Sequence, residues 1–140
     1  MLPTRVLLNT IEGNSRMAHD LLVKLLGSAN DECFAEALKL QIEEYAAIAK
    51  EADNRLCGGE RTVKVKKARK CALSSMDLTL LLDKSTERMA EMIILGSTMG
   101  IIDIVRALKE YDGYDEQVLG MAIRLKETEE NNIKAMLEFA

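Results

Sequence analysis

Apolar residues recur at intervals of three and four along most of the chain, which is the spacing of an amphipathic α-helix. The stripes predict five helices. The first covers about 4–26, the second ends at Gly58, and the other three cover about 61–83, 86–111 and 115–138. No segment shows the strict alternation of apolar and polar residues that is typical of a strand. The sequence therefore predicts an all-α protein.

Residues that start and stop helices stand between these stripes. Gly27 ends the first helix, and either Ser28 or Asn30 is expected to cap the second. Ser85 is the expected cap after a break near Asp83, and Asp112–Gly113 forms the last turn. Because the first and the last connections are short, we expect the helices on either side of each to be antiparallel neighbours.

The helix expected from Met89 to Leu108 is apolar nearly all round, which in a soluble protein indicates burial on most sides. Either the other helices enclose it, or part of its face lies in a subunit contact. Gly96 and Gly100 lie one helical turn apart and offer a smooth strip where another backbone can approach closely. We expect a homodimer with a two-fold contact at this helix, since short amphipathic helices rarely surround one of their own completely.

The predicted architecture is a five-helix, ferritin-like four-helix bundle in which the helix over 61–83 is the crossover. A simple up-down bundle of five helices is the alternative. The length of 140 residues suits a single domain, 1–140.

Composition adds limits on function. The chain has 48% hydrophobic and 30% charged residues with one proline. Its net charge of −4 argues against a nucleic-acid binder. Cys33, Cys57 and Cys71 show no paired spacing, which favours a reducing compartment over a disulfide scaffold. The start of the chain lacks the pattern of a signal peptide, and charges interrupt the apolar central stretch, so we expect a cytoplasmic protein without a membrane span.

The central stretch also resembles a known family. Ile94 to Val105 (Ile-Leu-Gly-Ser-Thr-Met-Gly-Ile-Ile-Asp-Ile-Val) resembles, without a gap, the Met-Ile-Pro-His-His-Gln-Gly-Ala-Ile-Asp-Met-Ala signature of a bacterial ferritin-like family of small helical domains. The likeness continues to Leu137. The resemblance implies a helical bundle with a histidine pair suspected of binding metal, but Ser97 and Thr98 stand at the histidine positions. The family's metal chemistry therefore does not transfer.

Polar residues interrupt the apolar stripes at mid-helix. Counting back from the turns places Asn14 level with Gln41, and Gly96 and Ser97 level with Thr128 and Glu129. These interruptions predict one polar layer across the bundle, formed by Asn14, Gln41, Glu44, Ser97, Thr98, Glu129 and Asn132. Gln41-x-x-Glu44 and Glu129-x-x-Asn132 match the spacing of the ligand pairs in di-iron bundles, although most of the residue types are poor ligands.

The layer permits several interpretations. We expect mutually hydrogen-bonded side chains that fix the helix register, as a buried Asn does in a coiled coil. A degenerate metal site or a small-ligand pocket is the alternative, and otherwise no cofactor is expected. His19 is expected to lie at the surface or at its boundary with the core, the methionines to fill the core, and the basic cluster of 61–70 to be solvated.

Two functions follow from these expectations. The first is a non-catalytic helical bundle that acts by self-association or by binding an unknown protein. The second is a ferritin-like binding protein with a degenerate metal or small-ligand site in its core. Catalysis is less favoured, because no nucleophile has a histidine partner by sequence.

Overall fold

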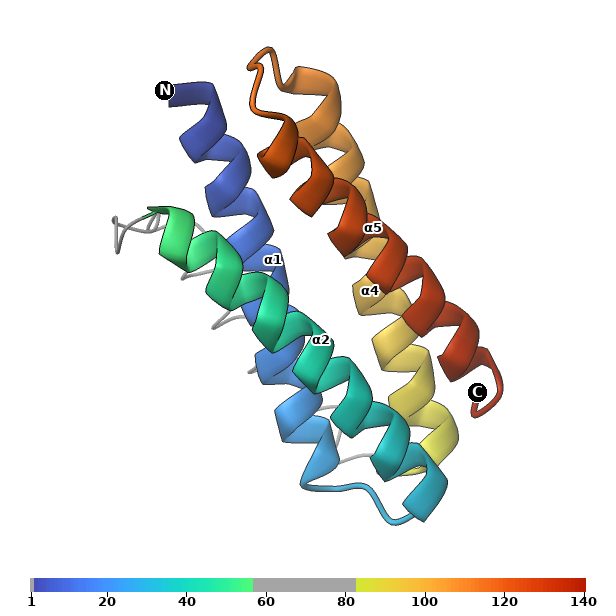
Figure 1. Cartoon of the computed structure of the whole chain (residues 1–140). Coiled ribbons are helices and arrows are strands. Elements are labelled where there is room, and N and C mark those ends of the chain that lie inside the picture. Colours follow the sequence, from blue (N-terminus) through green and yellow to red (C-terminus); the bar gives the residue numbers. More distant parts are fainter. Residues whose placement is uncertain (1, 57–82) are drawn as a thin grey trace.

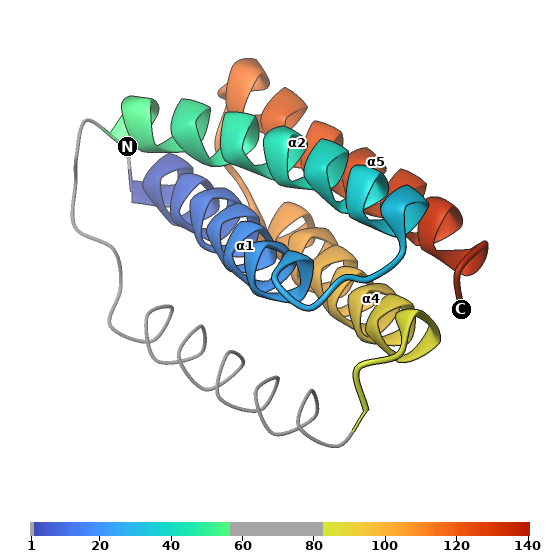
Figure 2. The same cartoon turned by 90° about the horizontal axis from the view of Figure 1, so that it is seen from below.

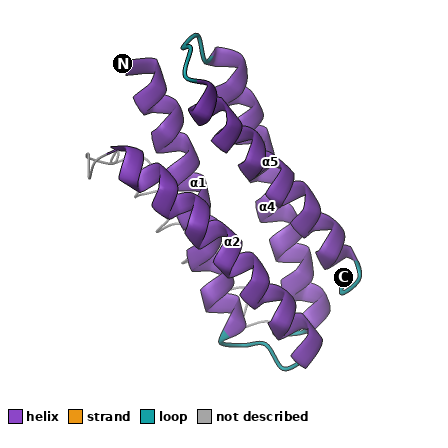
Figure 3. Ribbon diagram, viewed as in Figure 1, coloured by secondary structure: helices purple, strands orange, loops and turns teal. Residues whose placement is uncertain are grey.

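The computed structural model describes residues 2–56 and 83–140, and within them the chain forms helices and no strands (Figure 3). The four helices are α1 (Leu2–Leu26), α2 (Glu32–Leu56), α4 (Thr86–Glu110) and α5 (Glu116–Leu137) (Figure 1). The expected all-α class is confirmed. The fifth helix, expected over 61–83, lies outside the described residues.

The helices form a four-helix bundle in which the members of each hairpin run in opposite directions. α1 packs against α2, and α4 packs against α5, and a short connection joins the helices of each pair. The two hairpins contact each other along α1–α4 and along α2–α5. In the second view, α1 and α4 form one layer, and α2 and α5 form the other (Figure 2). The end of α2 and the start of α4 lie at opposite ends of the bundle, so these two helices run in the same direction (Figure 1).

The helix starts follow local hydrogen bonding. The Ser85 side chain accepts a hydrogen bond from the Arg88 amide, which confirms the expected cap of α4. The cap of α2 is Asp31 rather than Ser28 or Asn30, because the Asp31 carboxylate accepts from the Phe34 amide at 2.8 Å. Asp115 caps α5 in the same way. In each case a side-chain oxygen accepts a hydrogen bond from a free amide of the first helical turn.

The core is built from the apolar stripes that the sequence shows. Its largest fully buried side chains come from all four helices and include Leu7, Phe34, Tyr45, Met89, Leu125 and Met136. The Phe34 ring meets the Phe139 ring edge to face, with 5.3 Å between the ring centroids. This aromatic pair joins the start of α2 to the chain end after α5.

The three other described helices do not enclose α4. Met89, Ile93 and Ile104 face the core, but Leu95 and Met99 are 60% and 67% exposed. Ile102 continues this exposed apolar stripe one turn further along the helix. A helix at the corner of a four-helix bundle contacts two neighbours closely, so one of its sides is left outside. Within the described bundle α4 is therefore not enclosed, and the fifth helix of that expectation lies outside the described residues.

Candidate functional site

The structure brings most of the expected polar layer into the interior. Asn14 comes from α1, Gln41 from α2, Ser97 from α4, and Glu129 with Asn132 from α5, and each residue is less than a tenth exposed. Ser15 and Thr128 are buried with them. A mid-height polar layer formed by all four helices is thus present.

Two expected members are not in the layer. Thr98 is exposed, and its hydroxyl donates to the Ile94 carbonyl of the preceding turn at 2.7 Å. Glu44 is exposed beside Tyr45, and the partial burial of its carboxyl raises its pKa. The expectation was wrong for both because a helix rotates by about 100° per residue. Residue 98 therefore turns outward when Ser97 turns inward, and residue 44 does so when Tyr45 is buried.

The layer is not the mutual hydrogen-bond network that was expected. Asn14 Nδ2 donates to the Gly100 carbonyl at 3.3 Å, and Ser15 Oγ donates to the Ile11 carbonyl at 2.6 Å. Five other buried atoms at this level have no hydrogen-bond partner among the described residues, namely both amide atoms of Gln41, Tyr45 Oη, Glu129 Oε2 and Asn132 Nδ2. Each such atom costs about 1–3 kcal/mol, so these side chains form a costly arrangement.

Tyr45 belongs to the site, although its position in an apolar stripe indicated only a core residue. The whole residue is 1% exposed. Burial raises the pKa of its hydroxyl above the usual value, and the nearby Glu129 carboxyl adds to the rise. Ser97 and Asn132 lie beside the hydroxyl and act to lower its pKa, but neither forms a hydrogen bond of good geometry with it. The phenol is therefore neutral, with Ser97 and Asn132 as polar neighbours of its hydroxyl.

Glu129 has a buried carboxyl group whose pKa lies near neutrality. Burial, with a smaller contribution from the negative charge of Asp103, raises its pKa to about 8. Both causes act by disfavouring the charged form. At pH 7 the group is mainly a neutral carboxylic acid, which has one O–H donor as well as acceptor oxygens.

Gly100 is in the site because it makes room for this carboxyl group. A Cβ atom at residue 100 would lie 2.7 Å from Glu129 Oε2 and 2.8 Å from Glu129 Cδ. Gly96, by contrast, is exposed, and a Cβ atom there would meet no atom within 4 Å. The two glycines therefore do not form a strip for close approach of a backbone within the described bundle. One accommodates an acid, and the other faces open space.

A pocket of about 160 Å³ connects these groups to the surface, and we call it the core pocket. It lies between α1 and α4. Its walls are mainly apolar and include Leu21, Leu22, Leu25, Met92, Ile93 and Met99. Because Tyr45 and Glu129 come from the other layer of the bundle, they form its inner end with Ser97, while the exposed Met99, Gly96 and Asp103 stand at its mouth. The core pocket therefore has apolar walls and a polar inner end.

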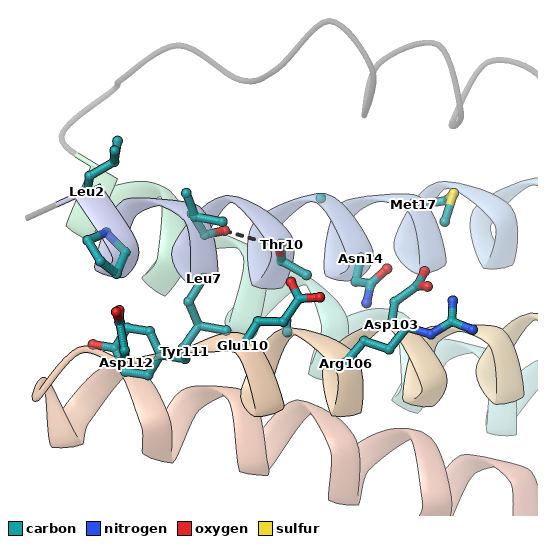
Figure 4. A pocket seen from close by; sticks show the side chains of 14 residues that line it. Leu2, Leu7, Thr10, Asn14, Met17, Asp103, Arg106, Glu110, Tyr111 and Asp112 are labelled. Atoms are coloured by element: carbon teal, nitrogen blue, oxygen red, sulfur yellow. Dashed lines mark hydrogen bonds between the residues drawn. The ribbon is translucent and has the colours of Figure 1, made fainter.

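A wider groove of about 680 Å³ continues from the core pocket towards the start of α1, and we call it the end groove. Asn14, Met17 and Asp103 line both spaces. Figure 4 shows Asn14 on α1 and Asp103 on α4 pointing towards one another where the spaces meet. At the far end Thr4 Oγ1 and Tyr111 Oη form a hydrogen bond of 2.9 Å.

The other candidate residues lie elsewhere or outside the described chain. His19 is partly buried, and its Nδ1 lies 3.0 Å from Asp20 Oδ1. Cys33 is a free, exposed cysteine, and Cys57, Cys71 and the basic cluster of 61–70 lie outside the described residues. Within residues 2–56 and 83–140, no three His, Cys, Asp or Glu side chains are grouped so that they could hold a metal ion.

Comparison with known proteins adds no relative to this description. No family model, no curated protein and no solved structure matches the chain. None of the four described helices is long and apolar enough to cross a membrane.

Proposed function

We propose that the protein is a non-catalytic binding protein that holds a small, mainly apolar molecule with a polar head in the core pocket. One observation carries the proposal. Tyr45 Oη and Glu129 Oε2 are buried and have no partner among the described residues, and both side chains lie at the inner end of an apolar pocket. Buried polar atoms are nearly always hydrogen-bonded in native proteins, so two such atoms facing one space indicate a partner that enters it.

The size of the pocket limits the ligand. An apolar cavity of about 150 Å³ in another protein holds benzene, so a space of this size suits a body of roughly six to eight heavy atoms. The core pocket has a similar volume. A longer molecule can extend past Asn14 and Asp103 into the end groove. Specificity follows the usual division of such sites, in which apolar walls provide affinity and a few polar groups fix the orientation.

Titration with 1-hexanol tests the proposal, because this alcohol has an aliphatic body of suitable size and a neutral hydrogen-bonding head. We expect saturable binding by calorimetry, with chemical-shift changes confined to residues lining the core pocket. Gly96→Leu is the blocking variant, since a Cβ at residue 96 meets no atom and the longer side chain occupies the mouth of the pocket. It should weaken binding about tenfold or more by filling the ligand's space. Gly120→Leu, at an equally open position on α5, should not weaken binding. Equal binding by all three proteins would contradict the proposal.

We infer a ferritin-like bundle from the resemblance at Ile94 to Val105. Two consecutive described helices, α2 and α4, run in parallel, which fits both a ferritin-like bundle with a long crossover and the alternative up-down bundle of five helices. Contacts of residues 61–83 measured by NMR would distinguish the two, since a crossover does not insert between the helices of the four-helix bundle. The metal site of that family is not part of the inference, because Ser97 and Thr98 replace its histidines.

A second candidate function is self-association through α4, and the exposed stripe of Leu95, Met99 and Ile102 favours it. The proposed partner is a second copy of the chain, with the two α4 helices antiparallel across a two-fold axis near Met99. In that register Leu95 meets Ile102 of the partner subunit, and Glu91 meets Arg106 of the partner subunit. The stripe is thus complementary to itself in shape and in charge, as an isologous contact requires.

A further inference from the structure

The charged and titratable groups around the core pocket indicate the class of head group that its ligand carries. We infer that the natural ligand is a protonated amine with an aliphatic body, whose ammonium group sits between Glu129 and Tyr45 at the inner end of the pocket. This inference rests on the proposed function and specifies its ligand class.

The titratable side chains that line the pocket favour a cation. Glu129, Asp103 and Tyr45 are all acids, and no Lys, Arg or His lines the core pocket among the described residues. An ammonium ion has three donors and no acceptor. Glu129 Oε2 and Tyr45 Oη are oxygen atoms without a partner in the described chain, each on a side chain more than nine-tenths buried, and both can accept from such a donor. An anionic head would instead meet Asp103 at the mouth and a carboxyl group at the inner end.

The same groups predict how binding is coupled to protons. Without ligand, burial and Asp103 raise the pKa of Glu129 and keep it mainly protonated at neutral pH. An ammonium ion beside the carboxyl group favours its ionised form, so binding releases the proton of Glu129. Ligand affinity must then rise with pH up to the pKa of the free carboxyl group and become constant above it.

Each helix packed around Glu129 contributes polar or titratable groups near its carboxyl group. α4 contributes the Asp103 carboxylate, and α2 contributes the Tyr45 phenol with Glu44 further out. On α1 the pocket is lined by the neutral Asn14 amide, which is bound to the Gly100 carbonyl, while the buried Glu12 carboxylate pairs with Arg16. Arg106 lines the end groove and not the core pocket.

The experiment compares n-hexylamine with 1-hexanol by calorimetry between about pH 6 and pH 9. We expect the affinity for the amine to rise about tenfold per pH unit up to about pH 7.5 and to become constant above about pH 8, with proton release seen as a heat that depends on the buffer. The affinity for the alcohol should change less than about threefold over this range, because its head carries no charge.

Two variants identify the groups responsible. Glu129→Gln should remove both the pH dependence and the proton release of amine binding, and circular dichroism checks that it folds. Asp103→Asn changes an exposed residue and removes a charge that raises the pKa of Glu129, so the affinity for the amine should become constant at a lower pH than in the wild type. Retention of the full pH dependence in Glu129→Gln would overturn the inference.

The outcomes separate the inference from the proposed function. If 1-hexanol binds in the pocket and n-hexylamine binds no better at any pH, the amine inference is overturned and the binding function stands. If neither compound binds wild-type protein at millimolar concentration, both are overturned. Tight, pH-dependent binding of the amine that Gly96→Leu abolishes supports both.

Discussion

The carboxyl group of Glu129 on α5 lies directly against the backbone of Gly100 on α4, in the space that any larger residue at position 100 would fill with its Cβ. Counting back from the Asp112–Gly113 turn placed Glu129 level with Ser97, which is about one helical turn away from Gly100. The reason is that Cα–Cβ bonds tilt towards the start of a helix, so the long Glu129 side chain reaches back along α5 to the level of Gly100.

This contact predicts opposite effects for matched glycine substitutions. Gly100→Ala should lower the free energy of unfolding by about 1–3 kcal/mol, because the buried carboxyl group must move from its place. Gly96→Ala and Gly120→Ala should raise it by about 0.5–1 kcal/mol, since alanine favours a helix and a Cβ at either position meets no atom. Urea denaturation measures all three. Stabilisation by Gly100→Ala would show that the Glu129 carboxyl group can leave this space at little cost.

The raised pKa of Glu129 predicts a loss of stability as the pH rises from about 4.5 to about 8. The folded state holds the proton up to about pH 8, whereas the unfolded chain releases it near the ordinary pKa of 4.5. Stability contributed by the bound proton is therefore present below about pH 4.5 and is lost progressively as the pH rises to about 8. In this window the free energy of unfolding should fall by on the order of 1 kcal/mol per pH unit.

Glu129→Gln provides the control for that slope, because glutamine cannot ionise. Subtracting its stability profile from that of the wild type should give a curve that falls from about pH 5 to about pH 8 and is flat above. Stability of the wild type that rises relative to the variant over this range would mean that the carboxyl group is ionised in the folded protein.

We expect the buried side chain of Gln41 to destabilise the folded protein. Both of its amide atoms are buried without a hydrogen-bond partner among the described residues. Gln41→Met keeps the length of the side chain and removes the polar atoms, so the free energy of unfolding should rise by about 1–3 kcal/mol. Ser15→Ala is the control, because the Ser15 hydroxyl is bonded to the Ile11 carbonyl and its removal should not stabilise the protein. A clear loss of stability in Gln41→Met would show that the amide has a partner.

Self-association through α4 predicts a dimer with a charge-dependent contact. Sedimentation of the wild type should give a dimer, and Leu95→Lys should give a monomer, since a charge then enters the centre of the contact. Leu40→Lys, at an equally exposed leucine on α2, should leave the dimer intact. Charge reversal of Glu91 or Arg106 alone should weaken the dimer about tenfold, and the double reversal should restore it. A wild type that sediments as a monomer at micromolar concentration would contradict the candidate.

Local sequence was sufficient for the helices of the described chain and their order. The ends of α1, α4 and α5 fall close to the expected positions, because stripes, caps and turns act over a few residues. The antiparallel hairpins followed from the short connections, and mid-helix polar residues predicted a buried layer. The one misplaced cap, at Asp31, still lies in the segment where the cap was expected.

The tertiary structure alone decided what the layer is. Rotation of each helix turned Glu44 and Thr98 outward, and periodicity fixes such angles only to within a residue or so. The location of the pocket depends on how closely α1 and α4 pack, which no stripe encodes. The state of Glu129 depends on burial and on Asp103, which belongs to a different helix and is near only in space. Desolvation and charge interactions are sums over all neighbours, so the chemistry of this acid appears only when four helices surround it.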